Sequence, residues 1–273
     1  MLITIDHETI YRYDSPVSYS IQSLRLTPQP FDGQSVRYWR VTSTVPAQFS
    51  SFQDSFGNVT QTLVIDRPYE ENCIRVQGVV DTVNTHGVVS GAVEPFPAMF
   101  YLRETEQTRP DGAIRALAKT VQATADTDVD CMHKMMLAIR NAIEYQTGES
   151  HAQTTAIEVM SQGVGVCQDH AHVFIACARS IGIPARYVSG YLLHTETGEV
   201  TQASHAWAEV MIPELGWIGF DVANRVCTTD QYVRIGVGLD YREAAPIRGI
   251  RRGGESEELS VKVRVSQSQS AAQ

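Results

Sequence analysis

The feature of this sequence that most constrains its fold is a change in the spacing of its apolar residues near position 111. From residue 2 to about 94, apolar and polar residues alternate, as in "ITIDHETIYRY" and "VRYWRVTSTV", and turn residues such as "DSFGN" separate the runs. A period of two with aromatic and β-branched residues is typical of half-buried strands. We therefore expect residues 1–94 to form an antiparallel β-sandwich.

A different pattern begins after the proline-containing stretch 95–110, which we expect to be a linker. Apolar residues recur at helical spacing in "GAIRALAKTVQAT" and "DCMHKMMLAIRNAIEY", and Asp130 is a candidate N-cap of the second helix. Strands return with "ARYVSGYLL", "SHAWAEVMI" and "GWIGFDV". Helices followed by adjacent strands predict an α+β fold. The second domain should span 111–265, with helices packed on an antiparallel sheet, and the polar tail 266–273 should be disordered.

Composition and charge exclude several classes of function. The chain has 273 residues, a formal net charge of −9 and one short basic run, "RGIRRG", so we expect no nucleic-acid partner. No stretch approaches the roughly 18 apolar residues of a membrane helix, and the first residues do not resemble a secretory signal. We therefore expect no membrane association and a cytoplasmic location. The five cysteines form no C-x-x-C pair, which argues against a disulfide framework and a common zinc site.

One cysteine occupies a position suited to chemistry. In "GVGVCQDHAH", Cys167 follows two glycines and opens a predicted helix. A thiol there faces unpaired backbone N–H groups and the positive end of the helix dipole, and both favour the nucleophilic thiolate. One alternative is a buried structural thiol, as we expect for Cys177. The other is a metal ligand beside His170 and His172, but residues two apart on a helix point about 200° away from each other and cannot share one ion. We expect no metal and no cofactor.

A thiolate nucleophile needs a base, and the base needs an orienting group. His205 lies in "SHAWAEV", and Asp221 ends the next predicted strand in "GWIGFDVAN". Two adjacent antiparallel strands can place these side chains together, with the helix start presenting Cys167 to the imidazole. The backbone N–H of Cys167 is a candidate oxyanion donor. The sequence leaves a second donor open among Gln162, Gln168 and Trp207, of which we expect Trp207 to pack beside His205 instead.

The segments "GVGVCQDHAHVFIACARSIGIPARYVSGYL" and "SHAWAEVMIPELGWIGFDVANR" resemble the transglutaminase-like superfamily, whose fold is shared with papain-like cysteine proteases. They are most similar to its bacterial branch of cysteine peptidases and amidohydrolases. "HETIYRYDSPVSYSIQSLRLTP" and "DSFGN" resemble the N-terminal β-region of that branch, and "GLDYREAAPIRG" resembles its closing segment. The resemblance implies Cys167 as nucleophile, His205 as general base and acid, and Asp221 as orienting carboxylate. The family usually continues its Asp with Pro-Thr-Asn, whereas Val222 and Ala223 precede Asn224 here, which leaves the local turn open.

The resemblance further implies a thiol hydrolase, a peptidase or amidase, that acts on a peptide, protein or amide substrate through a thioester. An amine in place of water would give cross-linking, and the sequence does not fix this choice. A CoA-dependent acyltransferase is a second possibility, against which the missing basic cluster argues. A non-catalytic interaction protein is a third, against which the intact triad argues. We expect residues 1–94 to do no chemistry and to shape substrate access; the oligomeric state is not indicated.

Overall fold

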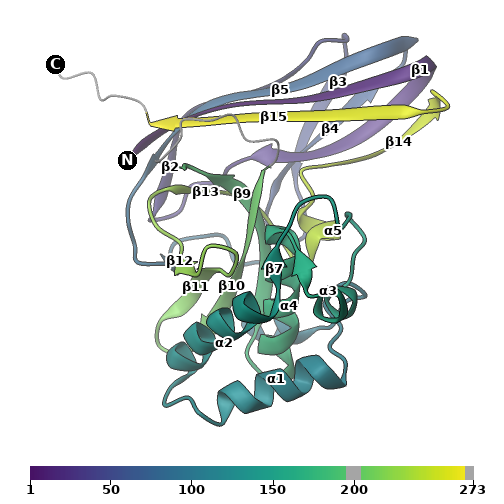
Figure 1. The fold of residues 1–273 in the computed structure, drawn as a ribbon. Helices are drawn as coiled ribbons and strands as arrows, with labels where there is room; N and C mark the ends of the chain where they lie inside the picture. The colour runs from purple at the N-terminus through teal and green to yellow at the C-terminus, as the bar shows by residue number, and fades with distance from the viewer. Residues whose placement is uncertain (195–203, 268–273) are drawn as a thin grey trace.

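The computed structural model describes residues 1–194 and 204–267. Its strands and helices divide into a large sheet of long antiparallel strands and a second antiparallel sheet covered by helices (Figure 1). The expected α+β class is therefore confirmed. None of the helices in the described residues combines the length and apolar character that crossing a bilayer requires.

The first sheet is organised around one long, central strand, β1 (Leu2–Thr27). Its first half pairs with β5 on one side and β15 on the other, and its second half pairs with β4 and β14. The pairing shifts between Arg12 and Val17, where Figure 1 shows the strand turning back on itself. The described strands of this sheet are β1 (Leu2–Thr27), β2 (Gln34–Ser43), β3 (Gln48–Gln53), β4 (Val59–Ile65), β5 (Tyr69–Thr82), β14 (Ile247–Gly253) and β15 (Glu257–Gln267).

The expected sandwich is built from the two halves of this one sheet. Ile74 and Val76 come from the half that contains β5, and Leu24 and Leu63 come from the half that contains β4. All four side chains are buried in one apolar cluster, because the alternating pattern gives each half an apolar face and the bend brings the two faces together.

The strand pairing differs from the expected division of the chain at the C-terminal end. The expected second domain includes residues 247–265, but β14 and β15 pair with β1 in the first sheet. The physical reason is that a central strand needs a partner along both edges, and alternation in "ELSVKVRVS" specifies a strand without specifying its sheet. The expected disordered tail, 266–273, begins inside β15, and residues 268–273 lie outside the described residues.

The second sheet and its helices form the other core. The described strands run in the order β12-β11-β10-β9-β13, with β6 added to β11, and all are antiparallel. They are β6 (Val88–Val89), β9 (Ala185–Leu192), β10 (His205–Ile212), β11 (Gly216–Asp221), β12 (Val226–Cys227) and β13 (Tyr232–Gly238). The α-helices are α1 (Gly112–Gln122), α2 (Asp128–Ala142), α3 (Ala156–Gln162), α4 (Cys167–Ser180) and α5 (Tyr241–Ala244). Helix α4 is central, because it packs on β9 and β10 and is itself covered by α1, α2 and α3.

The proline-containing stretch 95–110 packs against the second sheet instead of hanging free. It contains a short 3-10 helix (Ala98–Leu102) whose Tyr101 is fully buried and lies edge-on to Trp217 of β11. Just before it, the Glu94 carboxylate pairs with Arg186 of β9. Aromatic residues in this stretch are therefore core residues. The prolines had indicated only a linker.

At the start of α2, two neighbouring residues are candidate N-caps, and one of them caps the helix. Helix α2 is capped by Thr127, whose hydroxyl accepts from the Asp130 N–H, so the expectation of Asp130 as N-cap is wrong. The carboxylate of Asp130 instead accepts from the Asp126 N–H and pairs with Lys134. Both residue types are good caps, and the sequence "TDVD" offers both in one turn.

Candidate active site

The loop that leads into α4 places Cys167 at a helix start, as expected from the sequence. Helix α3 ends at Gly163, whose φ of 71° lies in the left-handed region that favours glycine. The next two residues form β8 (Val164–Gly165), which pairs in parallel with β7 (Glu144–Tyr145). At Gly165 a Cβ would lie 2.8 Å from the Cβ of Asp169, so a side chain does not fit there. Helix α4 then begins at Cys167.

A buried carboxylate anchors this helix start. The Oδ2 atom of Asp169 accepts from the Val166 N–H at 2.8 Å and from the Ser150 hydroxyl at 2.5 Å. Burial raises the pKa of Asp169, and these two hydrogen bonds oppose that shift. The residue before the cysteine is therefore held by a side chain of the same helix, which fixes where the first turn begins.

His205 and Asp221 meet across two adjacent strands. His205 is the first residue of β10 and Asp221 is the last residue of β11, and Nε2 of the imidazole lies 2.6 Å from Oδ2 of the carboxylate. Asp221 is fully buried. Because Nε2 contacts Asp221, Nδ1 is the ring nitrogen that Asp221 does not engage.

The electrostatics of this pair favour a protonated imidazole. Burial opposes a charge on the His205 ring, but the charge of Cys167 and the hydrogen bond to Asp221 outweigh it and raise the pKa of His205 to about 10. Burial likewise opposes a charge on Asp221, yet hydrogen bonds from His205, Asn224 and Tyr232 hold the pKa of Asp221 below its usual value. Both partners of the pair are therefore stabilised in their charged forms.

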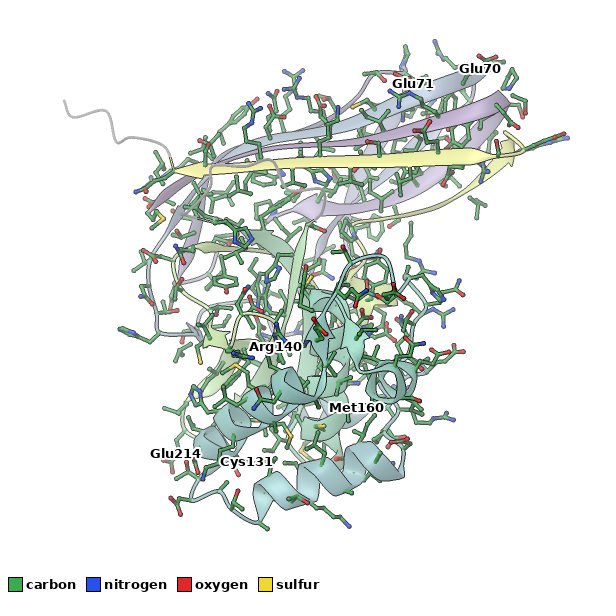
Figure 2. The ribbon with its side chains drawn as sticks, in the orientation of Figure 1. Glu70, Glu71, Cys131, Arg140, Met160 and Glu214 are labelled. Carbon is green, nitrogen blue, oxygen red and sulfur yellow. The ribbon has the colours of Figure 1, made fainter. Side chains whose placement is uncertain are left out.

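Two further side chains hold Asp221. The Asn224 side-chain amide donates to Oδ2 at 2.7 Å, and the Tyr232 hydroxyl donates to the same oxygen at 2.8 Å. The turn with Val222 and Ala223 keeps the Asn in contact with the carboxylate. Arg140 of α2 (Figure 2) supports this turn by donating to the Ala223 carbonyl at 3.1 Å. Tyr232 is a partner of Asp221 that the sequence does not indicate, because nothing in "DQYVRIG" marks it as one.

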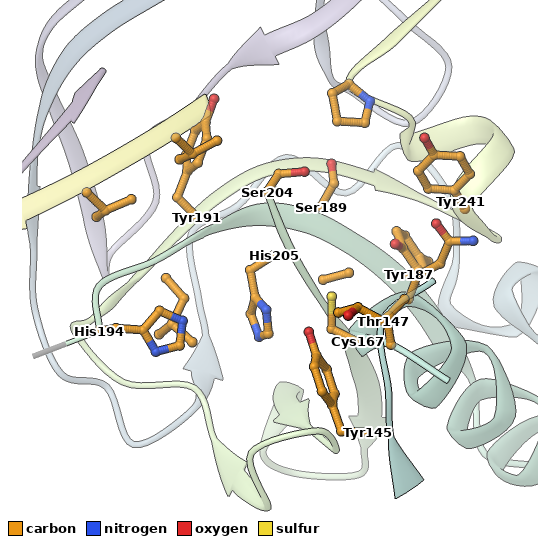
Figure 3. A pocket seen from close by; sticks show the side chains of 17 residues that line it. Tyr145, Thr147, Cys167, Tyr187, Ser189, Tyr191, His194, Ser204, His205 and Tyr241 are labelled. Carbon is orange, nitrogen blue, oxygen red and sulfur yellow. The ribbon is translucent and has the colours of Figure 1, made fainter. Parts of the chain in front are cut away.

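Cys167 and His205 open into one pocket of about 400 Å³. Figure 3 shows both side chains in it together with Tyr145, whose pKa is raised by burial and then by the charge of Cys167. The structure therefore brings the three expected residues together, two in the pocket and Asp221 behind the imidazole. The other lining residues are Thr147, Val166, Gln168, Tyr187, Ser189, Tyr191, Leu192, His194, Ser204, Ala206, Tyr241, Pro246, Val263 and Val265.

The other candidates from the sequence fall in different places. Gln168 lines the pocket, whereas Trp207 packs beside His205 with ring centroids 6.3 Å apart, as expected. His170 bonds to the carbonyls of Val166 and Ile143, and His172 accepts from the Tyr241 N–H. Cys177 is fully buried, and burial raises its pKa to about 12, which fits the expected structural thiol.

A buried ion cluster lies further along β10. Glu209 is fully buried and pairs with Arg186 of β9 at 2.6 Å and with Arg234 of β13 at 2.8 Å. Burial opposes the charge of Glu209, but Arg234 and Arg186 outweigh it and lower its pKa to about 2. The guanidinium of Arg186 also lies 3.8 Å from the centroid of the Trp217 ring. This cluster connects three strands of the second sheet, β9, β10 and β13.

Comparison with known proteins identifies the class to which this fold and site belong. Residues 115–222 match the profile of the transglutaminase-like superfamily, and residues 3–81 match that of the bacterial transglutaminase-like N-terminal region. The chain belongs to the transglutaminase-like superfamily. It is 31% identical to an uncharacterised protein of Mycobacterium leprae, over 95% of this chain and 96% of that protein. It is 29% identical to an uncharacterised protein of Mycobacterium tuberculosis, over 90% and 86% of the two chains.

A solved structure has the same fold along the whole chain. It is a protein of Cytophaga hutchinsonii described as a "Putative Cysteine Protease", with a TM-score of 0.80 and 20% sequence identity, and the match covers 100% of this chain and 92% of the other. At this identity the likeness concerns the fold alone.

Proposed function

We propose that this protein is a cysteine-dependent hydrolase that cleaves peptide or isopeptide amides, with Cys167 as nucleophile, His205 as general base and acid, and Asp221 as the carboxylate that orients the imidazole. The observation that carries the proposal is the 2.6 Å contact between His205 Nε2 and Asp221 Oδ2, with the imidazole in the same pocket as Cys167. Nucleophile, base and orienting group are the three parts that covalent amide hydrolysis requires.

The chemistry follows from these positions. The Cys167 thiolate forms a bond to the amide carbon, and the oxygen of the tetrahedral intermediate takes up the negative charge. The His205 imidazolium gives its proton to the leaving nitrogen, the carbon–nitrogen bond breaks, and a thioester remains. Water then attacks the thioester carbon while His205 accepts its proton, and breakage of the carbon–sulfur bond releases the acid and restores the thiolate.

The start of α4 supplies stabilisation for the intermediate. The first N–H groups of a helix have no partner within it, so the Cys167 N–H is available to bind the oxyanion beside the sulfur. Of the three candidates for a second donor, Gln168 is the one that lines the pocket. We therefore assign it as the second donor. Its side chain follows Cys167 directly on the first turn of the helix.

Cross-linking and a non-catalytic role are the two alternatives to this proposal. Cross-linking would use the same residues with an amine in place of water, and we favour hydrolysis because the pocket is open to water beside Cys167, which is itself partly exposed. We place the protein in the cytoplasm, since all five of its thiols are free. A non-catalytic role would give no reason for an imidazole whose charge is stabilised by both Cys167 and Asp221.

The test is a screen of peptide, glutamine side-chain and small amide substrates with wild type and Cys167→Ala. Cys227→Ala is the matched control, because Cys227 is also partly exposed and its Sγ lies 3.9 Å from a histidine nitrogen, Nε2 of His133. We expect turnover to vanish in Cys167→Ala and to persist in Cys227→Ala. Turnover that survives in Cys167→Ala would refute the assignment.

A further inference from the structure

The pocket has one end at Cys167 and another beyond His205, and strand β9 runs from the first to the second. Tyr187 lies at the Cys167 end, where the charge of Cys167 contributes to raising its pKa after burial. Three residues further along the strand, Gly190 pairs with His205. Beyond Gly190 come Tyr191 and Leu192. Figure 3 shows the same order, with Tyr191 and His194 on one side of His205 and Cys167 on the other.

Four residues at the end beyond His205 form an apolar wall, Tyr191, Leu192, Val263 and Val265, and the imidazole of His194 lines the same end (Figure 3). The two valines of the wall belong to β15, so this wall is assembled from both sheets. Val263 is buried in one cluster with Tyr191, and Val265 packs against that cluster.

The wall is held in place by the first sheet. The ring of Tyr191 is oriented by His7 of β1, whose Nδ1 lies 2.8 Å from the tyrosine hydroxyl oxygen. Val265 is paired with Ile5 of the same strand. A preformed apolar surface of this kind selects a ligand group by burial, without paying to order its own side chains.

We propose that the apolar wall is the subsite for the leaving amine, so that the preferred substrate carries an uncharged aliphatic or aromatic side chain on the amine side of the scissile bond. This inference rests on the proposed hydrolase. The acid that protonates the leaving nitrogen must lie beside it, so the substituent of that nitrogen extends past His205, away from Cys167. At this end of the pocket the substituent contacts the apolar wall.

The same reasoning applies to the second half of the reaction. The group that resolves the thioester enters where the leaving amine departed. An added amine attacks the thioester carbon, His205 accepts its proton, and the carbon–sulfur bond breaks to give a new amide and the free thiolate. An amine with an apolar side chain should therefore compete with water better than one without.

The experiment forms the thioester from N-acetylglycine p-nitrophenyl ester and measures how it partitions between water and added leucinamide, glycinamide or lysinamide. The α-amino groups of these amines have similar basicity, so the partition ratios for acylation at the α-amine report on the side chain, and the ε-acylated product of lysinamide is separated and counted apart. A side chain of this size in an apolar subsite is worth about 10-fold or more. We expect leucinamide to be captured about 10-fold more often than the other two. Equal capture of all three would overturn the inference.

Variants on β15 locate the effect. Val265→Thr keeps the shape of the side chain and places a hydroxyl in the wall, and we expect it to reduce the leucinamide preference about threefold or more. Val261→Thr is the matched control, because Val261 lies on the same face of β15 and packs on the same cluster but does not line the pocket. An equal loss of preference in both variants would show that the wall is not the subsite.

Two outcomes separate this inference from the proposed function. If p-nitrophenol release does not depend on Cys167, the hydrolase itself is wrong. If release depends on Cys167 and no amine intercepts the thioester, kcat/KM is compared for N-acetylglycyl-leucinamide and N-acetylglycyl-lysinamide. A leucine preference of about 10-fold that falls in Val265→Thr supports the wall, and equal values overturn it.

Discussion

The hydroxyl of Tyr232 donates to Asp221 at 2.8 Å although the two residues stand on strands that two other strands separate. Tyr232 begins β13 and Asp221 ends β11, and β10 and β9 lie between them in the sheet. Such a contact requires the sheet to curl around the imidazole, so the curvature of the sheet and the geometry of the candidate site depend on each other.

We expect Tyr232→Phe to keep the fold and to lower kcat/KM about fivefold, because a hydrogen bond to a charged group is worth about 1 kcal/mol or more. Tyr69→Phe is the control, since it removes a hydroxyl that bonds to Ser20 at the same 2.8 Å within the first sheet. Steady-state kinetics of the two variants make the test. An unchanged kcat/KM in Tyr232→Phe would mean that the tyrosine has no influence on His205.

We expect His205 to set the alkaline limit of activity. Its pKa of about 10 in the folded protein lies above the usual value for histidine, so the charged imidazole persists until the pH rises through about 10. We expect the rate to fall there, instead of near neutrality. The stability that the charged imidazole contributes is complete below its ordinary pKa, about 6.5, and is lost as the pH rises through about 10.

Asp221→Asn removes one of the groups that raise the pKa of His205. The alkaline limb of kcat/KM should therefore move to lower pH, and the loss of rate should be smaller than in His205→Ala, because the imidazole remains but is poorly held. Rate profiles between pH 5 and 11 would check this. A fully active Asp221→Asn enzyme with an unmoved limb would exclude Asp221 from the site.

Among the five thiols, Cys167 should react first with substoichiometric iodoacetamide at neutral pH. Burial raises the pKa of Cys73, Cys131 and Cys227, and it raises the pKa of Cys177 to about 12, so all four are poor thiolates. Only Cys167 combines a helix start with the His205 imidazolium. Peptide mapping reads out the result, and label found mainly on Cys73 or Cys227 would contradict it.

Glu209→Gln should lower the free energy of unfolding by about 3–5 kcal/mol at pH 7, because it removes a fully buried carboxylate that pairs with Arg234 and, together with Glu94, with Arg186. Since the pKa of Glu209 is lowered to about 2, the stability it contributes is present above its ordinary pKa and is lost as the pH falls through 2. Urea unfolding at pH 7 measures the first effect, and urea unfolding at a series of pH values from 5 down to 2 measures the second. Glu71→Gln (Figure 2) is the control: Glu71 is exposed and pairs with Arg12 at 2.8 Å, and a change below about 1 kcal/mol is expected there.

A fragment of residues 105–273 should be insoluble. In it β14 and β15 lose β1, which is their partner over their whole length, and Val263 loses Ile3 and Ile5 from its cluster. Expression with a solubility assay and a turnover assay tests this. A soluble fragment with wild-type activity on large and small substrates would show that the first sheet has no part in substrate access.

The part of the site that could be predicted from sequence is the part that local sequence encodes. A cysteine after two glycines at a helix start is a local pattern, and so are a histidine and an aspartate on consecutive strands. Tyr232 could not be found this way, because its contact with Asp221 depends on the curl of a whole sheet. The same limit applies to β14 and β15: alternation specifies a strand, whereas its partner depends on which edge of β1 is open.

The pairing of β1 with β15 has a consequence for the making of the protein. On the ribosome, β1 emerges first and meets β4 and β5 soon afterwards, but its other edge has no partner until β14 and β15 have been translated. An open strand edge pairs readily with other chains. Translation that stops before β15 would therefore leave an aggregation-prone product, in which Cys167 and His205 are already present but the two valines of the apolar wall are not.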